Sequence, residues 1–107
     1  MTMPGYRLAG RAFLIMATLR EQGWCVVIKC LPPQLGWIIQ GSASEYDAPA
    51  GDKAIGHGEW CCEAQWMGEG AYKHSRFAMG AEPWDAVQKV WDAIRADEIK
   101  AMQKAAQ

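Results

Sequence analysis

The sequence lacks any apolar run long enough to cross a membrane, and nothing in it resembles a secretory signal. The apolar run at residues 12–17 is short, lies well inside the chain and is followed by Thr-Leu-Arg-Glu instead of a cleavage site. The four cysteines, Cys25, Cys30, Cys61 and Cys62, lack the Cys-x-x-Cys spacing that zinc sites normally use. We therefore expect a cytoplasmic protein with reduced thiols, no metal site and no cofactor.

The chain also lacks the basic excess that is typical of nucleic-acid-binding proteins. Its net charge is −1, and the charge is unevenly distributed: residues 1–40 carry +3 and residues 41–70 carry −5. This balance argues against a nucleic-acid partner. The acidic segment with Glu45, Asp47 and Asp52 could instead attract a basic protein surface, although a solvated loop is the favoured interpretation.

The sequence does contain enough apolar residues to form one hydrophobic core. Half of the 107 residues are apolar, about a fifth are charged, and six are tryptophans. This composition is typical of a folded globular chain, and the length leaves little room for a second core. We expect a single domain over residues 1–107.

Two segments have helical spacing. Residues 6–22 place Leu8, Ala12, Ile15, Met16 and Leu19 on one stripe, and Gly23 provides a C-terminal cap. Phe13 and Leu14 lie partly outside that stripe, so this helix is expected either to be covered on more than one side or to show an apolar patch. The second helix begins at Pro83 and carries an apolar stripe up to Ile94. Its polar tail, residues 97–107, is expected to project or fray.

Four segments between these helices have strand character: residues 24–31, 35–41, 59–67 and 72–79. The first two are separated by Pro32-Pro33, which predicts a hairpin, whereas residues 42–58 have no clear period and predict a long loop. Alternation along each strand predicts one apolar and one polar face. The face expected to be inward collects Trp24, Val26, Ile28, Cys30, Trp37, Ile39, Trp60, Cys62, Ala64, Trp66, Phe77 and Met79.

These elements predict an α+β fold. We expect a two-layer sandwich in which an N-terminal and a C-terminal helix cover one face of a four-stranded antiparallel sheet, in the order α-β-β-β-β-α. The opposite sheet face would then be exposed. It mixes charged side chains with an aliphatic and aromatic patch, as protein interfaces do. The predicted partner-binding residues on it are Val27, Lys29, Ile38, Glu63, Tyr72, His74 and Arg76.

The sequence offers little for catalysis. Cys61 and His74 could form a nucleophile and base if the third and fourth strands are neighbours. The nearby Glu63 carboxylate would raise the thiol pKa instead of lowering it, so an ordinary polar sheet surface is the favoured interpretation. We therefore predict no catalytic, cofactor-binding or metal-binding residues.

The segment Tyr72–Pro83, in which the last strand runs into a Gly-x-x-Pro helix start, resembles a class of small phage and prophage proteins. The resemblance implies an accessory protein of a mobile element, and some such proteins resemble inhibitors of host defence, including anti-CRISPR proteins. The element order also resembles the double-stranded-RNA-binding domain. That family needs a basic motif at the start of its last helix, where this chain has Glu82, Trp84 and Asp85.

Three functional hypotheses follow. The favoured one is a non-catalytic protein-binding module that inhibits or modulates a host protein complex. The alternatives are a nucleic-acid-binding domain that uses Arg7, Arg11 and Arg20 on the first helix, and a small cysteine-dependent enzyme centred on Cys61 and His74. Homodimerisation is compatible with all three.

Overall fold

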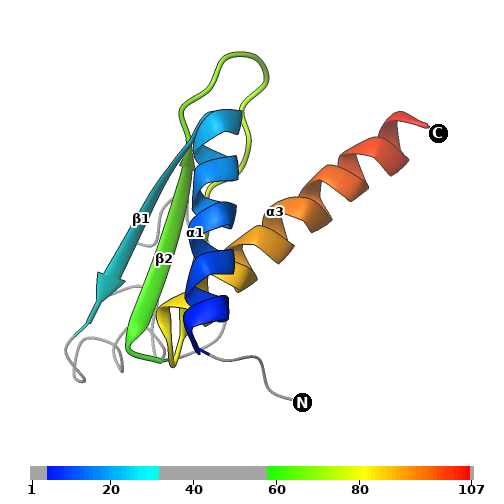
Figure 1. Cartoon of the computed structure of the whole chain (residues 1–107). Helices are drawn as coiled ribbons and strands as arrows, with labels where there is room; N and C mark the ends of the chain where they lie inside the picture. The colour runs from blue at the N-terminus through cyan, green and yellow to red at the C-terminus, as the bar shows by residue number, and fades with distance from the viewer. Residues whose placement is uncertain (1–4, 32–57, 107) are drawn as a thin grey trace.

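The structure, a computed structural model of the chain, describes residues 5–31 and 58–106. Figure 1 shows α1 lying along the sheet and α3 running obliquely away from it towards the C-terminus. Both predicted helices are present, and so is the predicted antiparallel sheet. The elements follow in the order α1 (Gly5–Gln22), β1 (Trp24–Cys30), β2 (Trp60–Trp66), β3 (Arg76–Gly80) and α3 (Pro83–Ala105).

Helix α1 ends where its sequence predicts. Ala12, Ile15 and Leu19 are its buried residues, one turn apart, and Gly23 follows the helix with a φ of 109°. That left-handed conformation favours glycine. A Cβ atom at Gly23 would also lie 3.0 Å from the Cα atom of Gly68, so the reversal from α1 into β1 leaves little room for a side chain.

The described strands form an antiparallel sheet in the order β1-β2-β3. β1 and β2 pair along their whole length, from Trp24 opposite Trp66 to Cys30 opposite Trp60. Beyond the strand ends, the amide of Leu31 donates to the carbonyl of Glu59 at 2.7 Å. The neighbour of β1 is therefore a strand nearly thirty residues further along the chain.

The prediction of a four-stranded sheet is wrong, because the described sheet contains three strands. The segment 35–41, predicted as the second strand, lies outside the described residues, as does most of the loop predicted over residues 42–58. A short apolar run beside two prolines is compatible with more than one structure, so its periodicity alone does not establish a strand.

The predicted orientation of the last strand is also wrong. β3 begins at Arg76, not at residue 72, and Ala78 lies opposite Cys62 on the face that the helices cover. Phe77 and Met79 therefore point to the other face. The reason is the close approach of α3: a Cβ atom at Gly80 would lie 2.6 Å from the Cβ atom of Asp85. Only small side chains fit at this part of the interface.

Helix α3 begins at Pro83 and presents a buried stripe to the sheet and to α1. Its tail does not fray at residue 97 but continues as helix to Ala105. The main core lies between the two helices and one face of the sheet, and Met16, Val26, Ile28, Trp66, Trp84 and Trp91 pack around it. Its buried members are Ala12, Ile15, Leu19, Trp24, Cys62, Ala64, Ala78, Ala86, Val87, Val90 and Ile94.

Two polar contacts fasten α3 to β3. The guanidinium of Arg76 donates to both carboxylate oxygens of Asp97, from Nε to Oδ2 at 2.7 Å and from Nη2 to Oδ1 at 2.5 Å. The ammonium of Lys89 donates to the backbone carbonyl of Met79 at 2.8 Å. A bidentate pair fixes orientation as well as distance, so Asp97 holds the first residue of β3 against the helix.

A second buried cluster lies on the other face of the sheet. It consists of Leu31, Cys61, Phe77 and Met79, each with at most 7% of its surface exposed. The helices that the structure describes pack on the opposite face, so this cluster is separate from the main core. The sheet is therefore apolar on both faces at β3, where the sequence predicts alternation.

Two leucines on α1 provide a matched test of this core. Leu19 is completely buried, whereas Leu14 is 70% exposed. We expect Leu19→Ala to lower the free energy of unfolding by about 2–5 kcal/mol, because it removes buried contacts and leaves a cavity. Leu14→Ala should change it by less than about 0.5 kcal/mol. Urea denaturation of both variants measures the difference, and equal losses would contradict the placement of α1.

Candidate functional site

Three predicted partner-binding residues lie together on the sheet face that the described helices leave uncovered. Val27 of β1 is directly opposite Glu63 of β2, and Lys29 is opposite Cys61. Val27 and Lys29 are exposed, and Glu63 is half-buried. The structure thus brings Val27, Lys29 and Glu63 together on one sheet face, but not the whole predicted patch, and their role in binding a partner stays a prediction.

Tyr72, His74 and Arg76 do not join that group. Together with residues of α3, they line a hollow of about 390 Å³, named here the loop–α3 hollow. The prediction placed them on the uncovered sheet face because it began the last strand at residue 72 and reversed its orientation. The remaining predicted partner-binding residues, Ile38, Glu45, Asp47 and Asp52, lie outside the described residues.

The structure does not bring Cys61 and His74 together. Cys61 belongs to the buried cluster on the sheet face opposite the described helices, whereas His74 is exposed and lines the loop–α3 hollow with Ile94 and Asp97 of α3. Cys61 pairs with Met79, which lies five residues along the chain from His74. A base this far from the thiol, on the other side of the sheet, cannot take its proton.

Burial makes the two adjacent cysteines poor nucleophiles. It raises the pKa of Cys61 to about 11; Lys29 opposes this change and Glu63 adds to it. Burial likewise raises the pKa of Cys62 to about 12, with further contributions from Cys61 and Glu63. At neutral pH both groups are thiols, and the thiolate is the reactive form.

The described residues contain no group of three His, Cys, Asp or Glu side chains placed to hold a metal ion. Over the same part of the chain, no helix combines the length and the apolar character needed to cross a bilayer. The cytoplasmic location stays a prediction.

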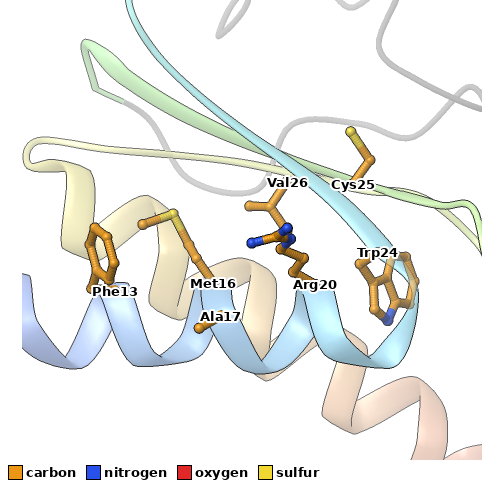
Figure 2. A pocket seen from close by; sticks show the side chains of 7 residues that line it. All are labelled: Phe13, Met16, Ala17, Arg20, Trp24, Cys25 and Val26. Carbon is orange, nitrogen blue, oxygen red and sulfur yellow. The ribbon is translucent and has the colours of Figure 1, made fainter.

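A second hollow lies between the first helix and the first strand. It encloses about 460 Å³ and is named here the α1–β1 groove. Figure 2 shows Phe13, Met16 and Arg20 rising from α1 towards β1, while the thiol of Cys25 points away from the helix. Ala17 from α1 and Trp24 and Val26 from β1 complete the lining.

The side of α1 that borders the groove is strongly apolar. Phe13 lines the groove and is 72% exposed, and Tyr6, about two turns before it on the same side of α1, is 74% exposed. Leu14 is also exposed, at 70%, but it lies about 100° round the helix from Phe13, outside the lining. Among the described residues that line the groove, Arg20 is the only charged one. Large apolar side chains are usually exposed singly, and a group of them beside a groove indicates a binding surface. An exposed apolar patch on this helix was one of the two outcomes that the sequence predicted, because Phe13 and Leu14 fall outside the buried stripe. The sequence did not show that Phe13 borders a groove.

The cysteines allow a direct chemical test. At neutral pH in the native protein, we expect a maleimide reagent to label the exposed Cys25 and Cys30 quickly. Cys61 and Cys62 should react only after denaturation, because burial keeps them protonated and covered. Mass spectrometry of digested samples assigns each label, and Cys25→Ser and Cys30→Ser give the controls. Fast native labelling of Cys61 would contradict this structure and revive the cysteine-enzyme hypothesis.

No protein-family model matches this chain, and no curated protein or solved structure matches it either. The resemblance to small phage and prophage proteins therefore stays a prediction. The function has to be argued from the surfaces of the molecule itself.

Proposed function

We propose that this protein is a non-catalytic protein-binding module that docks an acidic, amphipathic helix of a partner protein against α1, along the α1–β1 groove. The observation that carries the proposal is the exposure of Phe13, which lines a groove of about 460 Å³, and of Tyr6 on the same side of α1. Burying these side chains against a partner would remove apolar surface from water, which is the main driving force of association.

The spacing of the exposed residues on α1 favours a helix as the occupant. Tyr6, Phe13 and Arg20 are seven residues apart, about two helical turns, so they lie on one line along α1. Gly10 and Ala17 lie between them, and a Cβ atom at Gly10 would meet nothing within 4 Å. Large and small residues thus alternate along the line, and the side chains of a second helix can pack into the gaps.

The charge at the α1–β1 groove favours an acidic partner. Arg20 lines the groove and is exposed, and Glu21 is the only acidic residue of α1. Arg11 is exposed too, but it lines a different hollow together with Trp84 and Asp85. A partner helix with a carboxylate beside its apolar stripe would be attracted by Arg20, mainly through faster association. A second copy of the chain would bring the same arginine to the contact, so like charges disfavour pairing of two α1 helices at the groove.

A nucleic-acid partner is less well supported. The start of α3 carries Glu82 and Asp85 where a double-stranded-RNA-binding domain needs basic residues. Lys89, one turn further along, donates to the carbonyl of Met79. The arginines of α1 would have to neutralise phosphates almost alone, and beside them lies an exposed apolar patch.

The test compares a groove variant with a variant of an equally exposed residue elsewhere. Tagged wild type, Phe13→Ala and Met102→Ala are used to capture proteins from a bacterial lysate, and mass spectrometry quantifies what is bound. We expect a partner that wild type and Met102→Ala retain and that Phe13→Ala binds about tenfold or more weakly, because a buried aromatic anchor is lost. Phe13 is 72% exposed, so its replacement should leave the thermal unfolding midpoint unchanged.

Charge-reversal variants test whether the partner is acidic. Arg20→Glu should weaken capture and make it less dependent on salt, whereas Lys104→Glu at the far end of α3 should not. Cross-linking then locates the contact on the partner, which should be an acidic helix. The proposal fails if Phe13→Ala retains the partner fully, if the eluate holds only nucleic acid, or if light scattering shows a dimer that Phe13→Ala dissociates.

A further inference from the structure

The loop–α3 hollow has the size of a small-molecule site and lies apart from the helical line on α1. Its volume of about 390 Å³ falls in the range of pockets that hold small ligands. Tyr72, Lys73 and His74, before β3, and Arg76, at its start, form one wall, and the part of α3 from Ile94 to Ala101 forms the other. Trp24 lies between this hollow and the α1–β1 groove and lines both.

The two acidic side chains that line the hollow already form ion pairs with arginines. Asp97 accepts two hydrogen bonds from Arg76, and Glu98 accepts one from Arg95 at 3.1 Å. A cationic ligand would therefore have to compete with an existing guanidinium at each carboxylate. These pairings disfavour an amine or a metal ion as the occupant.

Lys73 is different. Its ammonium lies 4.4 Å from the ring centre of Trp66, and among the described residues it forms no ion pair. A lysine held over an aromatic face at the edge of a hollow is positioned to receive an anion, since the ring fixes the side chain without neutralising its charge. The charge available to a ligand here is thus positive.

The floor of the hollow is apolar. Trp24 and Ile94 line it and are buried, and the ring of Trp24 meets that of Trp66 edge to face at 5.3 Å. The ring of Trp66 lies behind this floor, and it is the ring over which Lys73 is held. A ligand with an apolar body would therefore find apolar side chains beside a single cationic group.

We propose that the loop–α3 hollow binds a small carboxylic acid with an aromatic or aliphatic body. The carboxylate lies at Lys73, where it gains charge-assisted hydrogen bonds. The apolar body covers Trp24, Ile94 and Ala101, and Tyr72, which is 68% exposed, closes over it. This site is separate from the proposed protein-binding function and does not depend on it.

The test uses 3-phenylpropionate as the probe and its neutral amide as the matched control. In ¹H–¹⁵N spectra, each tryptophan gives a separate indole N–H signal. We expect 3-phenylpropionate to shift saturably the signal of Trp24, which lines the hollow, and that of Trp66, whose ring lies under Lys73. The signals of Trp84 and Trp91, which neither line the hollow nor lie under Lys73, should stay in place. The amide should bind severalfold more weakly, because it lacks the charge that Lys73 recognises.

Variants assign the binding to the hollow. Lys73→Ala should weaken 3-phenylpropionate binding about fivefold and remove the preference over the amide, a loss typical of an exposed charge pair. Lys100→Ala on α3, outside the lining, and Phe13→Ala on α1 should leave it unchanged. Absence of a saturable shift at millimolar probe, equal binding of acid and amide, or unchanged binding by Lys73→Ala would each overturn the proposal. Loss of partner capture in Phe13→Ala with retained acid binding would separate the two sites.

Discussion

The rest of the structure depends on how closely α3 approaches the sheet. Gly80 has no room for a side chain beside Asp85, and Ala64, Ala78 and Ala86 are fully buried between the helix and the strands. Small residues at a contact allow backbones to approach and let the surrounding larger side chains interlock. Once Ala78 and Gly80 face the helix, the pleat of β3 sends Phe77 and Met79 to the opposite side.

That orientation decides which polar residues meet. Arg76, two residues before Ala78 on the same face, reaches Asp97 of α3 and is held by two hydrogen bonds. Tyr72 and His74 come just before Arg76 in the chain and lie on the same side of the sheet as α3. They form one wall of the loop–α3 hollow. Cys61 shares the other face with Phe77 and Met79. One packing constraint thus creates the loop–α3 hollow and separates the cysteine from the histidine.

The two proposed sites use different faces of the same core. Helix α1 buries Ala12, Ile15 and Leu19 and leaves Tyr6, Phe13 and Leu14 exposed, although all are apolar or aromatic. A helix that only needed to fold would place polar residues there. Trp24 packs in the core between the α1–β1 groove and the loop–α3 hollow, so it is the structural link between the surface proposed for a protein and the pocket proposed for an acid.

The sequence by itself determined both helices, the Gly23 reversal and the inward face of β1 and β2, because helical spacing, capping residues and strand alternation are local signals. It did not show that β1 pairs with residues 60–66, because that contact joins distant parts of the chain. It also showed that Phe13 and Leu14 fall outside the buried stripe. It could not predict the orientation of β3, where large apolar residues alternate with small ones and both kinds are buried. Only the tertiary structure shows that the small residues, Ala78 and Gly80, face α3, because the helix packs too closely for larger side chains. It alone also brought Asp97 to Arg76, twenty-one residues away, since contacts across the chain leave no periodic trace in the sequence.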